Sequence, residues 1–265
     1  MTDDQRGDAL QTLVIGGGTM GVGIAEVLQQ AGATVTVVEP SAIVAAKVEE
    51  RTGLRPLEVL PPSIDVELAI EAVPEDMTLK QKVLQGVELA VPETCVVATN
   101  TSSLSIDAIA ESLVRPARFI GMHFFNPVPK SLLVELVVGG HTADETVARA
   151  KSWVERMGKE QISVKDSPRF ATSRLGLAIG LEAIRMVQDN VASADDIDKG
   201  MVLGYKFPIG PLKLTDLVGL DVRLAIAEHL AAELGPRFDP PPLLRQMVAA
   251  GELGKKSGKG FYEWS

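Results

Sequence analysis

His123 is the one histidine of the chain that stands where a histidine could do chemistry. It ends the apolar run 119–122 and enters a loop that continues through Pro129. Loops at the carboxyl ends of strands line the ligand crevice of an open α/β sheet, so we expect the imidazole to act there as a general acid/base. His141 follows two glycines in a turn and His229 lies in a helical stretch, so we expect both to be solvated.

Glu135 follows His123 by twelve residues, inside the apolar run 132–138. A lone carboxylate among apolar residues needs a partner, because an unpaired buried charge is costly. A His–Glu pair across neighbouring strands would hold the imidazole in one tautomer and stabilise the imidazolium, as a general acid/base requires. The alternative is a glutamate on an edge strand that faces water beside an unrelated histidine. We expect the pair.

A polar run at 100–103, Asn-Thr-Ser-Ser, follows the predicted strand 95–99 and should face the same crevice. Its amide and its hydroxyls, that of Ser102 among them, could orient an alcohol or a carbonyl. The alternative is an N-cap for the helix expected after Leu104, although Ser105 can cap that helix without help.

A glycine-rich turn links the apolar run 13–15 to a predicted helix. It satisfies the G-x-G-x-x-G pattern of dinucleotide-binding folds and contains, in order, Gly16, Gly17, Gly18, Thr19, Met20 and Gly21. Gly16 permits the tight turn, Gly18 lets the backbone approach a pyrophosphate, and Gly21 lets the helix pack on the strand. The helix N-terminus supplies N–H groups for the phosphates.

Glu39 ends the next predicted strand, 23 positions after Gly16. A carboxylate there accepts hydrogen bonds from the 2′- and 3′-hydroxyls of an adenosine ribose and repels a 2′-phosphate, and the following Pro40 and Ser41 offer no cation. The turn and Glu39 together predict NAD(H) rather than NADP(H) as the cofactor. A glycine-rich turn without a ligand is the alternative, and the strand–turn–helix context argues against it.

Apolar strands alternate with helical stretches over the first 165 residues. This alternation predicts βαβ units and a Rossmann-type, mostly parallel sheet covered on both faces. The rest of the chain shows only helical periods, which we expect over 175–187, 194–203, 222–234 and 243–250, with Gly204 and Pro211 separating segments. We therefore expect an α/β NAD-binding domain over 1–165 and an all-helical domain over 166–265. Ser193 is expected to cap a helix of the second domain, and Thr142 with Glu145 to form a capping box in the first.

Composition narrows the class of protein. The chain has 265 residues, 46% of them hydrophobic, with 26 Lys+Arg against 35 Asp+Glu and a formal net charge of −9. So acidic a surface argues against a nucleic-acid or anionic-membrane partner. No apolar run reaches the roughly 18 residues of a membrane span, and the polar start at 1–10 is not typical of a signal peptide. A single cysteine, Cys95, excludes a disulfide framework and a Cys-based metal cluster, so we expect a cytoplasmic protein without a metal.

Five blocks of the sequence resemble the 3-hydroxyacyl-CoA dehydrogenase (3-hydroxybutyryl-CoA dehydrogenase) family. They are 14–25, 70–76 (IEAVPED), 100–106 (NTSSLSI), 121–129 (GMHFFNPVP), and the helical region with 210–221 (GPLKLTDLVGLD) and 254–262 (GKKSGKGFY). The resemblance spans nearly the whole chain. It implies an oxidoreductase of fatty acid metabolism that moves a hydride between NAD(H) and C3 of a 3-hydroxyacyl or 3-oxoacyl thioester.

Matched position by position, the resemblance implies roles for individual residues. His123 would be the general acid/base on the 3-hydroxyl, Glu135 its orienting partner, and Ser102 a hydrogen-bond partner of the substrate oxygen. The family's contacts to the nicotinamide dinucleotide fall on Glu75, Lys80, Ser102, Asn126 and Lys256. The resemblance also implies a homodimer formed through the helical domain, which its long apolar runs favour as well.

Two departures from the family pattern concern the substrate. The family motif D-x-P-G-F-I-x-N-R-L corresponds to 166–175, where Arg169 replaces the Gly and Ser173 replaces a substrate-site Asn. A hydroxyl is shorter than an amide and cannot donate and accept through separate atoms. The family also has a long helical hairpin that helps to hold CoA, whereas the segment 40–63 has room for about one short helix and a Pro-rich return.

Two alternatives to a 3-hydroxyacyl-CoA dehydrogenase follow from these departures. One is a dehydrogenase of a free hydroxy acid or of one bound to an acyl carrier protein, whose phosphopantetheine arm lacks the nucleotide of CoA. The other is a non-catalytic NAD-binding protein, which the replacement at Ser173 permits. The spacing of His123 and Glu135 argues against the second, because a structural protein has no need of it.

Overall fold

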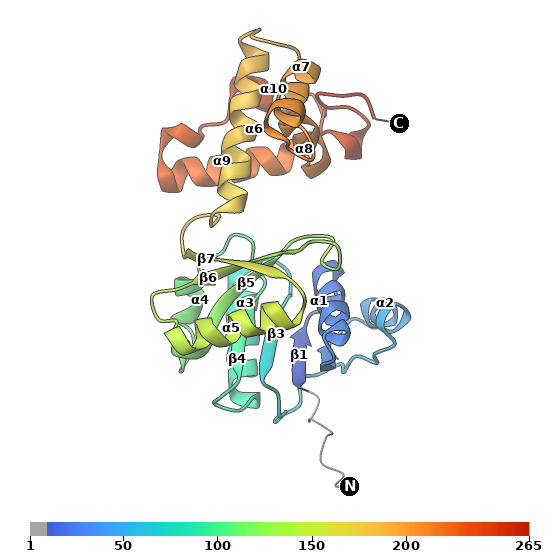
Figure 1. The fold of residues 1–265 in the computed structure, drawn as a ribbon, viewed down its shortest axis with the longest axis vertical. Coiled ribbons are helices and arrows are strands. Elements are labelled where there is room, and N and C mark those ends of the chain that lie inside the picture. The colour runs from blue at the N-terminus through green and yellow to red at the C-terminus, as the bar shows by residue number, and fades with distance from the viewer. Residues whose placement is uncertain (1–9, 265) are drawn as a thin grey trace. The chain divides into compact units, whose positions relative to one another are not determined.

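The computed structural model describes residues 10–264. The chain divides into two compact units, Met1–Phe170 and Ala171–Ser265, each of which is described by itself (Figure 1). This division falls five residues after the boundary expected at 165/166. Most of the polar start that bears on a signal peptide, residues 1–9, lies outside the described residues.

The first unit alternates strands and helices. Its strands are β1 (Gln11–Ile15), β2 (Thr34–Val38), β3 (Leu68–Glu71), β4 (Val96–Thr99), β5 (Phe119–Phe124), β6 (Leu133–Val138) and β7 (Glu160–Lys165). Its helices are α1 (Thr19–Gln30), α2 (Ala42–Thr52), α3 (Met77–Ala90), α4 (Ile106–Ala110) and α5 (Asp144–Arg156).

One sheet runs through the first unit in the strand order β2-β1-β3-β4-β5-β6-β7. Neighbouring strands are parallel except β5 and β6. Val14 of β1 packs in one core with residues of α1 and α5, whereas the adjacent Leu13 packs in a second core with residues of α3 and α4. The predicted Rossmann-type sheet with helices on both faces is therefore confirmed. Because β1 to β5 are parallel, the loops after them share one edge of the sheet.

The second unit is all-helical, as predicted. It contains α6 (Thr172–Gln188), α7 (Ala194–Lys199), α8 (Pro211–Val218), α9 (Leu220–Leu234) and α10 (Pro242–Ala249). Ser193 caps α7, since its hydroxyl accepts a hydrogen bond from the N–H of Asp196 at 3.1 Å. A core of its own, with Leu181, Leu212 and Leu230 fully buried, holds the helices together.

Three local predictions differ from the structure. The capping box at Thr142 is wrong: the N-cap of α5 is Ala143, and the Thr142 hydroxyl donates instead to the carbonyl of Phe119 at 2.8 Å. The helix expected over 194–203 changes at Gly200 into a π-helical turn, Gly200–Gly204. Helix α8 was not expected, although proline is favourable in the first turn of a helix.

None of the described helices combines the length and the apolar character needed to cross a bilayer. Both histidines expected to be solvated, His141 and His229, are exposed.

Candidate active site

The glycine-rich turn lies between β1 and α1 at the carboxyl edge of the sheet. Gly16 has φ +98°, and a Cβ on it would lie 2.7 Å from the carbonyl oxygen of Ala72. A Cβ on Gly21 would lie 1.8 Å from the carbonyl oxygen of Gly16. The Cβ position of Gly18 faces open space, and no side chain caps α1, in whose first turn Thr19 and Met20 lie. Two glycines thus serve the packing of the turn, and the third leaves the helix N-terminus accessible to an anion.

Glu39 follows β2 beside this turn. Its Oε2 accepts a hydrogen bond from the N–H of Gly17 and its Oε1 one from the N–H of Ser41, both at 2.8 Å. The two backbone donors hold the carboxylate in place, and each oxygen keeps a lone pair for a further donor. A diol fits this arrangement better than a phosphate does, and the turn with Glu39 fits the adenosine and pyrophosphate of NAD.

His123 and Glu135 face each other across the antiparallel pair β5–β6, where they are register partners. The distance from His123 Nδ1 to Glu135 Oε2 is 2.9 Å, and the two residues are 6% and 0% exposed. Glu135 is not on an edge strand, because β7 pairs with the other side of β6. A carboxylate can only accept, so Nδ1 donates and Nε2 is left with its lone pair for a proton.

Aromatic rings enclose the imidazole. The ring centroid of His123 lies 4.4 Å from that of Phe125 and 5.9 Å from that of Phe170. Phe170 has φ +53° and the preceding Arg169 has φ +60°, so two residues with side chains adopt the left-handed conformation in succession. This strained turn ends with the Phe170 ring buried against the histidine.

Glu75 organises the polar run after β4. Its Oε1 accepts hydrogen bonds from the Thr101 hydroxyl (2.7 Å), the Ser102 N–H (2.9 Å), the Ser103 hydroxyl (2.9 Å) and the Ser102 hydroxyl (3.2 Å). Burial raises the pKa of Glu75, but the hydrogen bond from Thr101 and the positive charge of Lys80 outweigh it and hold that pKa below its usual range. Ser102 is not needed as an N-cap, since Ser105 accepts from the N–H at the start of α4.

Lys80 lies in α3 with 1% of its surface exposed. Its ammonium meets Glu71 Oε1 at 2.8 Å, the carbonyl oxygen of Val73 at 3.2 Å and Glu75 Oε2 at 3.4 Å. The Lys80 ammonium, which was expected to contact the cofactor, is thus surrounded by acceptors of the protein itself. Glu71 is a residue that sequence reasoning missed, although a charge within the apolar run 68–72 was a signal that could have found it.

Asn126 and Asn100 belong to the two loops beside His123. Asn126 is exposed, and it precedes a cis peptide bond to Pro127. The Asn100 side-chain carbonyl accepts a hydrogen bond from the N–H of Phe124 at 2.9 Å and ties the β4 loop to β5. The buried Lys159 donates to the carbonyl oxygens of Val128 and Ser131 and holds the loop that carries Asn126. Lys159 is a further support that the sequence did not reveal, whereas the Asn100 amide, which was expected to orient a substrate oxygen, uses its own oxygen within the protein.

The helical unit carries the two remaining predicted site residues. Ser173 lies half-buried in the first turn of α6. The Lys256 ammonium is exposed and lies 2.6 Å from Asp221 Oδ2. The positions of Ser173 and Lys256 are thus described within the helical unit alone.

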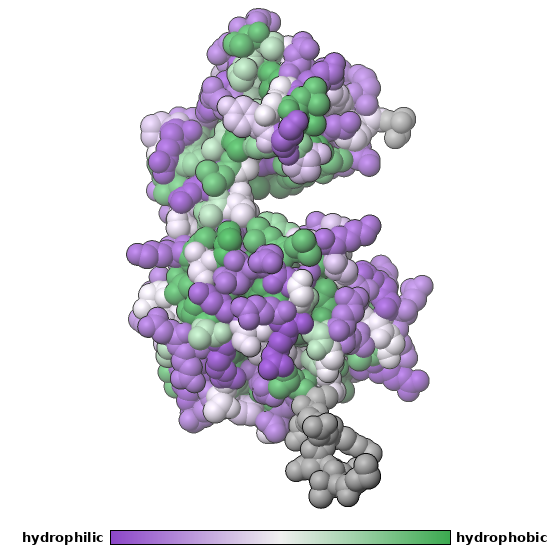
Figure 2. Space-filling model, viewed as in Figure 1, coloured by the Kyte–Doolittle hydropathy of each residue, from purple (hydrophilic) through white to green (hydrophobic). Residues whose placement is uncertain are grey.

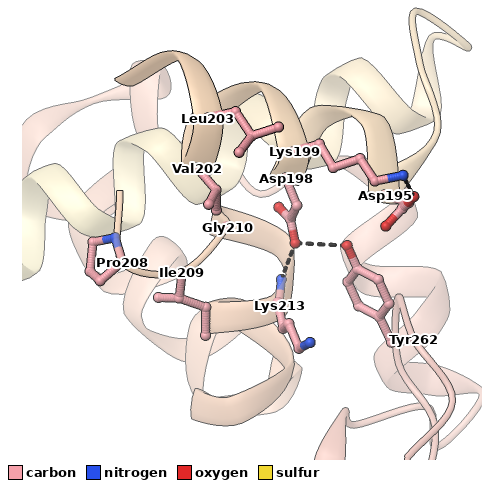
Figure 3. A pocket seen from close by; sticks show the side chains of 10 residues that line it. All are labelled: Asp195, Asp198, Lys199, Val202, Leu203, Pro208, Ile209, Gly210, Lys213 and Tyr262. Atoms are coloured by element: carbon pink, nitrogen blue, oxygen red, sulfur yellow. Dashed lines mark hydrogen bonds and ion pairs between the residues drawn. The ribbon is translucent and has the colours of Figure 1, made fainter. Parts of the chain in front are cut away.

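A pocket of about 460 Å³ opens in the helical unit, with apolar walls that include Val202 and Ile209 (Figure 3). Asp198 lies at its base, where Oδ2 accepts from the Tyr262 hydroxyl and the Lys213 N–H, both at 2.8 Å, as Figure 3 shows. The adjacent Gly210 leaves room for that carboxylate, since a Cβ there would lie 2.1 Å from Asp198 Cγ. Asp198 thus stabilises the start of α8 and the position of the C-terminal segment.

Comparison with known proteins identifies the chain's relatives. Its residues 11–58 and 52–167 match the family model of the 3-hydroxyacyl-CoA dehydrogenase NAD binding domain, and 170–264 match that of the C-terminal domain. A 3-hydroxybutyryl-CoA dehydrogenase of Mycobacterium tuberculosis is 40% identical over 97% of this chain and 99% of its own. The mitochondrial hydroxyacyl-coenzyme A dehydrogenase of Mus musculus is 36% identical over 95% of this chain and 90% of its own.

Solved structures agree with these matches. The crystal structure of an (S)-3-hydroxybutyryl-CoA dehydrogenase from Ralstonia eutropha is 37% identical, with a TM-score of 0.88, and the match covers 97% of this chain and 99% of that one. The two pieces of the NAD-binding match meet at 52–58, and the M. tuberculosis alignment spans 284 positions against the 265 residues of this chain. The two pieces overlap within the segment 40–63, where the shortening was expected.

Proposed function

The chain belongs to the 3-hydroxyacyl-CoA dehydrogenase family and is an NAD-dependent oxidoreductase, and on that premise we propose that it interconverts a 3-hydroxyacyl-CoA and the corresponding 3-oxoacyl-CoA. The hydrogen bond between buried His123 and Glu135 is the observation that carries this proposal. A dehydrogenase needs a base for the hydroxyl proton of its substrate, and this pair presents one.

His123 Nε2 takes the proton of the 3-hydroxyl when the alcohol is oxidised, and the imidazolium returns it when the ketone is reduced. Glu135 Oε2 accepts the hydrogen bond from Nδ1 at 2.9 Å, and a carboxylate in this buried position would stabilise the imidazolium. NAD, when bound, supplies the acceptor or the donor of the hydride at C3. The rings of Phe125 and Phe170 exclude water from the imidazole.

Ser102 orients the substrate oxygen in this scheme. Its hydroxyl makes the longest of the four contacts to Glu75 Oε1, at 3.2 Å, so it can turn to a ligand while Thr101, Ser103 and its own N–H keep the loop in place. Ser173 takes a second hydrogen bond to the substrate from the helical unit, in keeping with the family position that it occupies.

Different residues are assigned to the different parts of NAD. Gly16, Gly18, Gly21, Thr19 and Met20 form the pyrophosphate turn, and Glu39 takes the adenosine ribose. Glu75, Ser102 and Asn126 expose polar groups in the loops after β3, β4 and β5, and we assign them to the nicotinamide half. Lys256, which is exposed on the helical unit, takes the cofactor role of its family position. Lys80, a residue that is 1% exposed, contributes to this half of the site through its ion pair with Glu75 at 3.4 Å.

Consumption of NADH with acetoacetyl-CoA tests the proposal. We expect turnover by the native protein and a loss of roughly 10²–10⁴ in kcat for His123→Gln, the range of a lost general acid/base. The affinity for NADH, measured by titration in the absence of substrate, should change little in this variant. Near-normal turnover by His123→Gln would remove His123 from the mechanism, and no turnover by the native protein would refute this substrate.

A second substrate class is favoured by the short segment between α2 and β3. The match to the family's NAD-binding model is broken at 52–58, and the M. tuberculosis alignment has more positions than this chain has residues, which is consistent with fewer residues here to hold the nucleotide of CoA. The alternative substrate is a hydroxy acid that is free or bound to an acyl carrier protein. A kcat/KM for acetoacetyl carrier protein or for acetoacetyl-pantetheine above that for acetoacetyl-CoA would favour it.

We also propose a homodimer formed through the helical unit. This unit exposes large apolar side chains, some of which Figure 2 shows on its surface; they are Leu175, Val191, Leu203, Tyr205, Leu217, Val218 and Val222. Burying such side chains against a second copy is favourable. We place the protein in the cytoplasm, because its single cysteine, Cys95, fits a reducing compartment.

A further inference from the structure

Glu71 is a fully buried carboxylate that the proposed mechanism does not use. It is the last residue of β3, in the interior of the sheet between β1 and β4. Its Oε1 accepts from the Val73 N–H at 2.6 Å and from the Lys80 ammonium at 2.8 Å, and its Oε2 accepts from the Thr99 hydroxyl at 2.6 Å. A charge in this position is tolerated only because three donors, one of them charged, surround it.

Lys80 donates hydrogen bonds to Glu71 and to the carbonyl oxygen of Val73, and it forms an ion pair with Glu75. An ammonium group has three N–H bonds, and three acceptors lie within 3.4 Å of it: Glu71, the carbonyl of Val73 and Glu75. Of the two carboxylates, Glu71 is fully buried, whereas 36% of the Glu75 side chain is exposed. The buried charges therefore act on the site through Glu75.

Glu75 in turn determines the position of the loop that carries Ser102. One of its oxygens faces Lys80, and the other accepts all four hydrogen bonds from residues 101–103. If the ammonium moved, Glu75 Oε2 would lose its charged partner, and the carboxylate could rotate away from the loop. The contacts run from β3 through α3 to the loop after β4.

We propose that Glu71 is a positioning residue of the active site: it fixes the Lys80 ammonium, the ammonium fixes Glu75, and Glu75 sets the position of Ser102. This inference rests on the proposed role of Ser102 in orienting the substrate. Displacement of a substrate-orienting group by about 1 Å can lower the rate about 10²-fold, so the effect belongs in kcat.

Glu71→Gln tests the inference, with Glu67→Gln as the matched control on an exposed residue just before the same strand. The glutamine has one carbonyl oxygen for three donors, and its NH₂ must face one of them. We expect kcat with acetoacetyl-CoA to fall about 10- to 100-fold, and the affinity for NADH to weaken by a smaller factor, because Glu75 and Ser102 are also assigned to the nicotinamide half of the cofactor. Glu67→Gln should match the native protein in both.

A double-mutant cycle with Glu75→Ala separates positioning from general damage to the fold. If Glu71 acts through Glu75, then Glu71→Gln in the Glu75→Ala background causes no further loss of kcat. Losses that multiply would overturn the inference, as would a weaker affinity for NADH at unchanged kcat. Should Glu71→Gln fail to fold, Lys80→Met/Glu71→Met, which removes both buried charges together, takes its place in the cycle.

Amide hydrogen exchange of residues 101–104 provides a readout that does not depend on turnover. Protection of the Ser102 N–H, which donates to Glu75, should fall in Glu71→Gln and in Glu75→Ala but not in Glu67→Gln. Unchanged protection in Glu71→Gln would overturn the inference. The variants could show this pattern of exchange while the native protein reduces no thioester. In that case the proposed function would fail, but the positioning network would stand.

Discussion

Glu135→Gln is the sharpest test of the proton-transfer chemistry. It replaces one buried carboxylate oxygen of Glu135 by an NH₂ group and hardly changes the volume of the side chain. In the native protein a carboxylate oxygen lies 2.9 Å from Nδ1, which leaves the Nε2 lone pair for the substrate proton. A glutamine can present its NH₂ to Nδ1 instead, and the proton then resides on Nε2, where the base is needed. The variant also lacks the negative charge that stabilises the imidazolium.

The magnitude follows from the burial of the pair. Glu135 is 0% exposed and His123 6%, so water cannot replace the lost charge. An inverted tautomer in a buried His–carboxylate pair costs up to about 10⁴-fold in kcat, and loss of a general base about 10²–10⁴-fold. We therefore expect kcat to fall by roughly 10²–10⁴, which is about 2.7–5.4 kcal/mol at 1.36 kcal/mol per tenfold.

The assay is the oxidation of NADH by acetoacetyl-CoA across a range of pH. Glu111→Gln, on an exposed residue after α4, serves as the matched control and should behave as the native protein does. Thermal unfolding of Glu135→Gln shows whether the variant is folded at the assay temperature. A folded variant with native kcat and an unaltered pH–rate profile would refute the pairing on which the mechanism depends.

Four further predictions follow from the sites described. NADH should bind more tightly than NADPH, and Glu39→Ala should weaken NADH binding at least tenfold, by the roughly 1.5–3 kcal/mol of hydrogen bonds to a charged group; a preference of the native protein for NADPH would contradict this. Ser173→Asn should leave kcat/KM on acetoacetyl-CoA intact or raise it by one hydrogen bond, roughly 0.5–1.5 kcal/mol, if that thioester is the substrate, and should lower activity on a carrier-bound hydroxy acid if that is the substrate instead; no effect on either would place position 173 outside the site. Arg169→Gly should raise the melting temperature, because the left-handed φ of +60° costs a residue with a Cβ about 1–2 kcal/mol; a lower melting temperature would mean that the arginine side chain contributes more than this strain. Sedimentation at micromolar concentration should show a dimer, and a monomer would contradict the proposed interface.

Periodic patterns explain how much of the fold was predictable. The alternation of apolar strands with helices depends on local spacing, and the sheet with helices on both faces is confirmed. The errors lie where side chains had a choice of partner. The Thr142 hydroxyl could have capped α5, but the carbonyl of Phe119, 23 residues earlier in the chain, is its acceptor in the fold. Pro211 opens a helix rather than separating two segments.

The candidate site was predictable to the extent that its residues follow strands. His123 and Glu135 occupy neighbouring strands, so a regular register was enough to expect them side by side. Glu71 gave a weaker signal, because one charge among apolar residues in a sequence does not show which donors will meet it. Its three donors come from the next loop, from α3 and from β4, and only the folded sheet brings them together.

The buried charges also explain why the supports of a site are harder to predict than its reactive groups. A reactive group must be accessible, so it follows a strand or opens a helix at a known edge of the sheet. A support such as Glu71 or Lys80 must be surrounded, and the free energy of burying it is offset only when all its partners are in place at once. Because that condition involves several segments, no single motif expresses it. In this protein the groups that would touch substrate are carried by short recognisable runs, whereas the charge that holds Glu75 in place is defined by the fold.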